Sequence, residues 1–252
     1  MSDSLAFNNE TLLYNNQYEL YYLDSYNPLN LPANTVRVRT SDGNAPHKTV
    51  TTSYGTATLV PGTTDVYDVY KSGTNFDYLL YYSRNIVEVL GANTTGITSM
   101  KSMFHGCYIT TVPLFDTSSV TDISAMFVAC EYLTSVPLFN TSNATNMEDM
   151  FYNCWALTTV PLFDTSSVTN MTYTFYNCKS LTSIPLFNTS NVTNMTYTFY
   201  NCYKVQSGAL ALYQQASTQA IPPSIHTSTF TDCGRDTVTG AAELAQIPAD
   251  WK

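Results

Sequence analysis

The sequence predicts a mainly β protein with short helices, in which a small β domain precedes a solenoid of five repeats that a helical cap closes. Three observations lead to this fold class. A tripeptide and a cysteine recur at nearly constant spacing in the middle of the chain, strand-like segments precede them, and helix-like segments follow. We therefore expect three parts, namely residues 1–84, 85–202 and 203–252.

The repeat unit is 23 or 24 residues long. The tripeptide Pro-Leu-Phe begins, 24 residues apart, at Pro113, Pro137, Pro161 and Pro185. Cysteines recur at spacings of 23 and then 24, at Cys107, Cys130, Cys154, Cys178 and Cys202. A degenerate first copy, "VEVLGANTTGITSMKSMFHGC", brings the number of copies to five. A unit this short cannot bury its own apolar face, so stacked copies are expected to share one core.

Each copy is expected to contain a short strand and a short helix. The first part reads Leu-x-x-Val-Pro-Leu, as at 157–162, and its proline should end the strand pairing. The second part, as at 147–154, has apolar residues at i, i+3, i+4 and i+7, which is typical of one helix face. Thr145 before it and Glu148 three residues later fit a capping box.

The repeat "LTSVPLFNTSNATNMEDMFYNC" resembles the BspA-like leucine-rich repeat of bacterial surface proteins, with its motif Val-Thr-x-Met-x-x-Met-Phe-x-x-Cys. The resemblance covers about residues 85–202 and recurs in all five copies. It implies a leucine-rich-repeat solenoid used in adhesion or host contact, without catalysis. The segments "VRVRTSDGNAPHKTV" and "SGALALYQQASTQAIPPSIHTSTFTDCG" also resemble parts that accompany such repeats in gut bacterial and gut phage proteins.

The flanking segments have patterns of their own. In residues 1–84, "TVRVRTS", "TATLVPG" and "DVYDVYKSG" predict short strands bounded by turns. The opening 27 residues, rich in Tyr and Asn, form either an arm that docks on a partner subunit or the first strand of this β domain. After Cys202, "SGALALYQQAST" predicts a helix with Ser207 as its N-cap, and "GAAELAQIPADWK" predicts a second helix. Together they are expected to cap the solenoid.

Two further columns of residues each have a structural and a chemical interpretation. The five cysteines predict a buried apolar column, because metal sites need clustered ligands and disulfides need suitably directed side chains. Cys233 is expected to stand outside this column and to cover its end. A second column consists of Asn93, Asp116, Asn140, Asp164 and Asn188. These side chains are expected to bond turn backbone, with calcium binding as the alternative. No cofactor is expected.

Aromatic residues provide the candidate binding site. They recur at equivalent positions beside the apolar stripe of the later repeats: Tyr152, Trp155, Tyr173, Tyr176, Tyr197, Tyr200 and Tyr203. Exposed aromatic patches often mark binding sites. The alternative is that the rings pack against one another between repeats. The sequence leaves both interpretations open.

Composition and motifs argue against several classes of function. The net charge is −9 with only ten Lys and Arg residues, which argues against binding to nucleic acid. No apolar stretch approaches the roughly 18 residues of a membrane helix, so membrane insertion is not expected. The three histidines, His47, His105 and His226, lie in different segments, and no catalytic motif surrounds them. We therefore do not expect an enzyme.

The start of the sequence lacks the basic and apolar regions of a signal peptide. The leading hypothesis is a phage virion component, a fibre or decoration protein, exposed on the virion or another extracellular surface. The N-terminal region would hold a virion protein or further copies of the chain. A cell-surface glycan or protein is the expected receptor, bound through weak multivalent contacts. The alternatives are a bacterial cell-surface adhesin and a carbohydrate-binding module.

Overall fold

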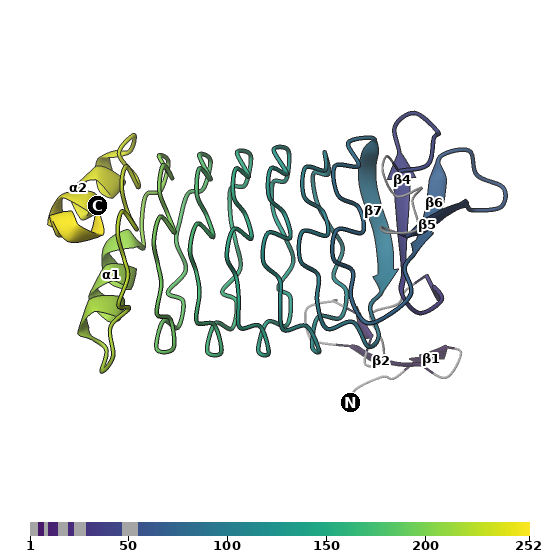
Figure 1. Cartoon of the computed structure of the whole chain (residues 1–252), viewed down its shortest axis with the longest axis horizontal. Helices are drawn as coiled ribbons and strands as arrows, with labels where there is room; N and C mark the ends of the chain where they lie inside the picture. The colour runs from purple at the N-terminus through teal and green to yellow at the C-terminus, as the bar shows by residue number, and fades with distance from the viewer. Residues whose placement is uncertain (1–4, 8–9, 15–19, 23–28, 47–54) are drawn as a thin grey trace.

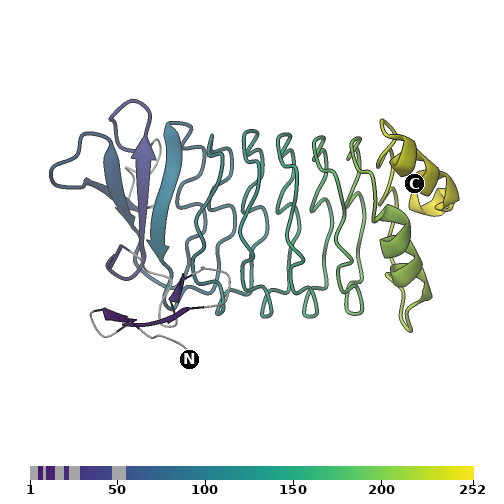
Figure 2. The ribbon, with the colours of Figure 1, turned by 180° about the vertical axis from the view of Figure 1, so that it is seen from behind.

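The computed structural model of the chain describes residues 5–7, 10–14, 20–22, 29–46 and 55–252. They form an elongated molecule with a β-sheet at one end, two helices at the other and a stack of coils between them (Figure 1). The view from behind shows the same order along the long axis (Figure 2). The regular elements are strands and a few short helices, which confirms the predicted mainly β class with short helices.

Two antiparallel sheets form the N-terminal part. The first has the order β1-β2-β3 and consists of β1 (Leu5–Phe7), β2 (Glu10–Tyr14) and β3 (Leu20–Tyr22). The second has the order β5-β6-β4-β7 and consists of β4 (Thr35–Thr40), β5 (Thr56–Leu59), β6 (Val66–Tyr70) and β7 (Ile86–Asn93). The three predicted strands are confirmed as β4, β5 and β6. The expected docking arm lies partly outside the described residues, and its described parts form β1, β2 and β3.

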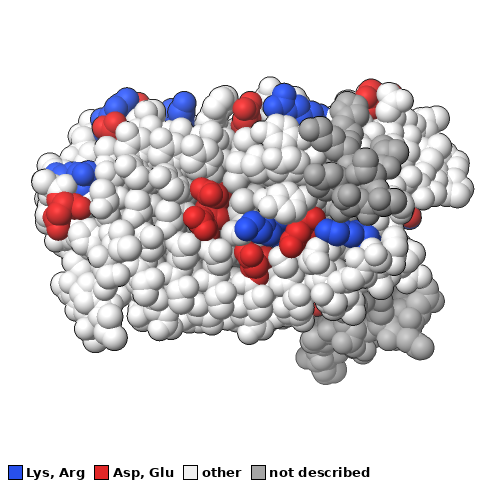
Figure 3. Space-filling model, in the orientation of Figure 1, with Lys and Arg blue, Asp and Glu red and all other residues white. Residues whose placement is uncertain are grey.

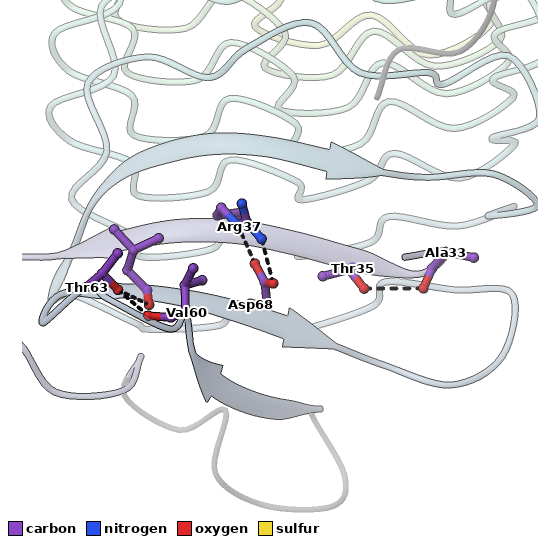
Figure 4. Close-up of polar contacts among 7 residues, drawn as sticks. Ala33, Thr35, Arg37, Val60, Thr63 and Asp68 are labelled. Atoms are coloured by element: carbon purple, nitrogen blue, oxygen red, sulfur yellow. Dashed lines mark hydrogen bonds and ion pairs between the residues drawn. The ribbon is translucent and has the colours of Figure 1, made fainter. Parts of the chain in front are cut away.

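An ion pair joins the two central strands of the four-stranded sheet. Arg37 on β4 lies opposite Asp68 on β6. Its Nε and Nη2 groups donate to the two carboxylate oxygens at 2.6 and 2.8 Å, as Figure 4 shows. A bidentate pair of this kind adds geometric specificity to the strand pairing. Val36 and Val38, on the other face of β4, are buried in the core.

Strand β7 connects this sheet to the coils. It pairs with β4 from Thr35 opposite Asn93 to Thr40 opposite Ile86. The predicted division after residue 84 therefore falls just before a strand of the same sheet. The buried valines of β4 and the buried residues of the coils belong to one continuous core.

Backbone hydrogen bonds join each coil to the next. Single parallel bridges link equivalent residues in the order Asn75, Ser99, Asp122, Asn146, Asn170, Asn194 and Ile225. After each bridge, alternate N–H groups donate to the next coil, as that of Asp149 does to the carbonyl of Thr172. The N–H groups between them bond within the coil, as that of Tyr152 does to Asp149. Neighbouring coils thus supply hydrogen-bond partners for many of each other's backbone N–H and C=O groups.

The short helix predicted in each copy is wrong. At 147–154 the chain forms consecutive turns, and Asp149 and Asn153 have φ angles of 57° and 60°. This left-handed conformation is incompatible with a right-handed helix. The capping box is wrong as well, because the Thr145 hydroxyl donates to the carbonyl of Thr121 in the preceding coil. The apolar residues of the segment nevertheless share one buried face.

In the four later copies, the segments predicted as strands have no regular strand pairing apart from an isolated bridge between Ser183 and Ser207, whereas the equivalent segment of the first copy is β7. In the Pro-Leu-Phe motif, the carbonyl of Pro161 accepts the N–H of Phe163 at 3.0 Å. This bond closes a three-residue γ-turn with Leu162 at its apex. As a result Leu162 is 59% exposed, and Phe163 is buried in its place.

The coil pattern extends beyond both ends of the predicted repeat region. Leu80 donates its N–H to Met103 in the next coil, as the later phenylalanines do at the equivalent position. At the other end, the ring of Phe230 stacks on that of Phe199 at 5.7 Å. Cys233 follows Cys202 at the end of the cysteine column, as expected, but it continues the repeat pattern instead of standing outside it. It is buried three residues after Phe230, the same spacing as in the earlier coils.

The predicted cysteine and Asx columns are confirmed. The cysteines are buried, and the thiols from Cys107 to Cys202 donate to a carbonyl of the preceding coil at 3.0–3.3 Å. In the Asx column each side chain accepts the N–H of the residue two positions ahead at 2.8–3.2 Å: Asn93, Asp116, Asn140, Asp164 and Asn188. These bonds hold the turns that follow the Pro-Leu-Phe motifs.

A column of phenylalanine rings runs through the core of the stack. It consists of Phe104, Phe127, Phe151, Phe175, Phe199 and Phe230. Neighbouring rings lie 5.1–5.7 Å apart and within 3–10° of parallel. Ring pairs at this separation add to the stabilisation from buried area.

Both predicted C-terminal helices are present, as α1 (Ala209–Thr218) and α2 (Val238–Gln246), followed by a short 3-10 helix at Ala249–Trp251. The predicted N-cap Ser207 is wrong, because Gly208 occupies that position with a φ of 101°. Trp251 stacks on His226 with ring centroids 4.1 Å apart, and it also contacts the ring of Phe230. It thus covers the last ring of the phenylalanine column.

Candidate functional site

Five tyrosine rings form one layer on the outside of the stack. The rings of Tyr152, Tyr176 and Tyr200 stack face to face at 4.8 and 5.0 Å. Beside them, Tyr173 and Tyr197 stack at 5.1 Å, and the two rows meet edge to face at 5.3–6.3 Å. All five residues are partly exposed. The rings of this tyrosine layer therefore pack on one another and still present an accessible surface.

Each row of the layer comes from one position of the repeat. Tyr173 and Tyr197 occupy a position with a left-handed backbone, and both have a φ of 55°. The second row lies three residues later in each coil, at Tyr176 and Tyr200. Adjacent coils have the spacing of adjacent strands, about 4.8 Å, so rings at equivalent positions stack.

The tyrosine layer ends at a hollow of about 570 Å³. In the coil that lines its middle, the positions of Tyr173 and Tyr176 are taken by Ala125 and Val128. One coil earlier, Ser102 takes the first of these positions. Small side chains in place of rings leave the space open. The volume lies within the range typical of small-molecule sites.

Aromatic rings also line the far end of the hollow. Tyr78, Tyr81 and His105 contribute there, and the ring of Tyr81 lies 5.5 Å from Tyr78 and 4.7 Å from His105. Burial lowers the pKa of His105, which favours its neutral form near pH 7. These residues were not predicted from the sequence, because the repeats were recognised by their cysteines and the coil at 75–83 contains none. The 24-residue spacing from Tyr78 to Ser102 is the signal that could have revealed it.

Asp149 places a carboxyl group in the hollow. It occupies the repeat position of Tyr173, one coil earlier. Within the described residues, no hydrogen bond or ion pair engages its carboxylate. The pKa of Asp149 is raised to about 6, mainly by burial and also by the charge of Glu148, and the charge of Lys101 partly offsets this rise. Near pH 7 the group is mostly ionised while partly removed from water.

A protein family described as "Mycoplasma protein of unknown function, DUF285" matches residues 74–160 and 98–212. Together the two ranges span 74–212, which is more than half of the 252 residues. The chain belongs to this family. The match contains the whole region whose sequence resembles BspA-like repeats. The description of the family states no activity, so a function has to be argued from the site itself.

The DUF285 chain is also similar to a solved structure, that of a leucine-rich repeat protein from Eubacterium ventriosum. The two chains have 20% sequence identity and a TM-score of 0.44, over 64% of the DUF285 chain and 43% of the other. The DUF285 chain thus spans less than half the length of that protein. No curated protein matches it in sequence.

Two of the candidate aromatic residues lie apart from the tyrosine layer. Trp155 is 41% exposed, and the ammonium group of Lys179 lies 5.0 Å from its ring centroid. Tyr203 has the guanidinium group of Arg235 over its ring at 4.0 Å. Among the described residues, no ring contact joins either of them to the layer. The structure thus brings together five of the candidates, and a binding role for each remains a prediction.

A row of leucines forms a second exposed surface on the DUF285 chain. The leucines of the four Pro-Leu-Phe motifs are 39–60% exposed: Leu114, Leu138, Leu162 and Leu186. A smaller hollow of about 280 Å³ lies among the first three of them. The structure makes them a second candidate contact surface.

The arrangement offers ring faces and one carboxylate rather than a metal centre. Among the residues that the structure describes, no group of three His, Cys, Asp or Glu side chains could hold a metal ion. His47 lies outside the described residues. Within the same described residues, no helix is long and apolar enough to cross a membrane.

The buried thiols lead to a first prediction. Native DUF285 chain treated with iodoacetamide near pH 8 should stay unlabelled while unfolded chain is labelled at all six cysteines. The thiolate is the reactive form, and burial raises the pKa of all six thiols, to about 12 for Cys107. Intact-mass spectrometry counts the labels, with a sample in denaturant as the control. Rapid labelling of any column cysteine in the native protein would contradict the packing described above.

Proposed function

We propose that the DUF285 chain is a non-enzymatic recognition protein, a leucine-rich-repeat solenoid of five central repeats with a helical cap, that binds its ligand at the tyrosine layer and the adjoining hollow. The observation that carries this proposal is the continuity of the two features, since exposed stacked rings lead directly into an open hollow. The low charge of the chain supports it, since only 12% of the residues are Asp, Glu, Lys or Arg. Figure 3 shows that acidic and basic side chains occupy only a small part of the side of the molecule seen there.

The construction of the layer suits recognition. Tyrosine supplies a large, amphipathic contact area at low conformational-entropy cost. Here the rings also hold one another in place, and the hydrogen bonds between coils hold the backbone beneath them. A site that is already ordered loses less entropy when a ligand binds.

The location that we propose is the surface of a phage virion, with the chain as a fibre or decoration protein. The N-terminal region, 1–84, would hold another virion protein or a second copy of the chain, and the coils would contact a glycan or protein on the host surface. Many copies of a weak site would raise the overall avidity. The alternatives are a bacterial cell-surface adhesin and a carbohydrate-binding module.

Proteomic analysis of the source culture tests this location. Peptides from the chain in purified virions would support the virion proposal. Peptides found only in cell-envelope fractions would contradict it and support the adhesin. Titration with a set of neutral oligosaccharides, followed by the fluorescence of Trp155, tests the carbohydrate-binding module.

A binding assay on whole cells tests the recognition proposal. The double variant Tyr152→Ser/Tyr176→Ser should bind cells about tenfold or more weakly than the wild type, because it removes two adjoining ring faces of the layer. The matched control is Tyr132→Ser, which removes a 52% exposed tyrosine outside the layer. Equal loss in both variants, or no loss in the double variant, would contradict the proposed site.

A further inference from the structure

We propose that the hollow binds an organic cation, a quaternary or alkylated ammonium group, between the carboxylate of Asp149 and the free ring faces of Tyr152 and Tyr173. This inference rests on the proposed function and names the ligand class of the same site. It follows from the way the two tyrosine rows end, from the charge in the hollow and from the chemistry of aromatic faces.

Both rows of rings end at the hollow. Tyr152 stacks on Tyr176 on one side, and Val128 occupies the equivalent position on its other side. Tyr173 stacks on Tyr197 on one side, and Asp149 takes the equivalent position on the other. Each row therefore presents one ring face toward the hollow that no neighbouring ring covers. The two terminal rings meet at 6.1 Å with an interplanar angle of 72°. They thus form two walls of a corner.

The carboxylate of Asp149 lies beside this corner without a partner among the described residues. Among the residues that the structure describes, no Lys or Arg lines the hollow. The charged groups that act on Asp149 are Glu148, which adds negative charge, and Lys101, which partly offsets it. The net charge of the chain, −9, also attracts cations to the molecule.

The combination of groups selects a cation. The face of an aromatic ring carries negative charge density, so a cation over it is attracted while an anion is repelled. A carboxylate adds a full charge of the same sign. A neutral sugar could stack on the ring faces and donate hydroxyl hydrogen bonds to the carboxylate, whereas only a cation gains Coulomb attraction from both the rings and the carboxylate. A hollow larger than an ammonium group leaves room for the rest of the ligand.

Isothermal titration calorimetry on the full chain tests the inference, with choline as the probe. The control ligand is 3,3-dimethylbutanol, which has the shape of choline but carries no charge. Choline should bind about tenfold or more tightly than this isostere, because only the cation gains from the rings and the carboxylate. Equal affinity for the two ligands, or no saturable binding of choline, would overturn the inference.

Variants distinguish the effect of the Asp149 carboxylate on choline affinity from the effect of negative charge nearby. Asp149→Asn should weaken choline binding about tenfold or more. Its matched control, Glu148→Gln, removes the same charge from the neighbouring residue and should change the affinity less than about threefold. Lys101→Met should tighten binding. Thermal melts show whether each variant is folded. Folded Asp149→Asn that binds choline as the wild type does would overturn the inference.

The pH dependence provides a second readout. Asp149 is protonated as the pH falls through about 6, the pKa to which burial and the neighbouring charge of Glu148 raise it. From about pH 7.5 to about pH 5, the ionised fraction and hence the apparent affinity should fall about tenfold. Glu148, Lys101, Tyr173 and His105 also face this region, and only His105 would gain positive charge over that range. Asp149→Asn should remove most of this dependence, and a tenfold fall in affinity that persists in this variant would contradict the assignment to Asp149.

The outcome also separates this inference from the proposed function. In one outcome, cell binding requires the tyrosine layer and yet is unchanged by Asp149→Asn and by excess choline. That result would overturn the cation inference and leave the recognition proposal standing. Choline binding in solution that depends on Asp149, without any binding to cells, would support the cation site and contradict the proposed role at a cell surface.

Discussion

Phe175→Ala will lower the free energy of unfolding by about 3–5 kcal/mol. Its side chain is fully buried, and its ring stacks on Phe151 at 5.4 Å and on Phe199 at 5.1 Å. Alanine would leave a cavity between coils whose spacing is held by hydrogen bonds, so the walls cannot collapse to fill it. Urea unfolding followed by circular dichroism measures the change.

The control for this prediction is Leu162→Ala, which also shortens a large apolar side chain in a repeat. Leu162 lies exposed at the apex of its γ-turn, so its removal should change the free energy of unfolding by less than about 1 kcal/mol. A loss for Phe175→Ala no greater than that for Leu162→Ala would show that the phenylalanine column does not hold the coils together.

Gly208→Ala should lower the free energy of unfolding by about 3 kcal/mol or more. Gly208 is the N-cap of α1 with a φ of 101°, and an added Cβ would overlap the carbonyl oxygen of Ile184. A left-handed backbone at a residue with a side chain costs roughly 1–2 kcal/mol, and the overlap adds to it by forcing the backbone to move. Thermal unfolding at equal protein concentration measures the loss.

Gly73→Ala isolates the backbone contribution. Gly73 has nearly the same φ, 98°, but a Cβ there would meet no atom within 4 Å. This variant should lose only the roughly 1–2 kcal/mol of the left-handed backbone. Equal losses for the two variants would mean that the contact with Ile184 contributes nothing and that α1 can shift freely.

Periodicity alone indicated the stacking and its buried columns, because residues that recur every 24 positions meet when coils stack. It could not show the conformation of the backbone within a coil. Apolar residues at i, i+3, i+4 and i+7 occur on a helix face, but two turns with left-handed residues also place them on one side. The residue types at Asp149 and Asn153, which tolerate a positive φ, were the available hint. Tyr173 and Tyr197 occupy positions equivalent to Asp149, and because tyrosine rarely adopts a positive φ, they gave no sign of this conformation.

The candidate site was partly predictable for the same reason. Five tyrosines recur at two positions of the repeat, so the spacing of the sequence was enough to suggest that their rings stack. The hollow could not be foreseen, because it is formed by Ala125, Val128 and Ser102, which interrupt the pattern. The altered pKa of Asp149 depends on burial by residues from other coils, which no local motif encodes.

Because every coil presents the same hydrogen-bonding edges, unequal recombination between near-identical segments such as 157–178 and 181–202 would add or delete one coil without breaking the ladder. A coil gained between Ala125 and Asp149 would move the two aromatic ends of the hollow apart by about 4.8 Å. At the proposed site, the length of ligand that fits the hollow would then change in steps of one coil, without a new core.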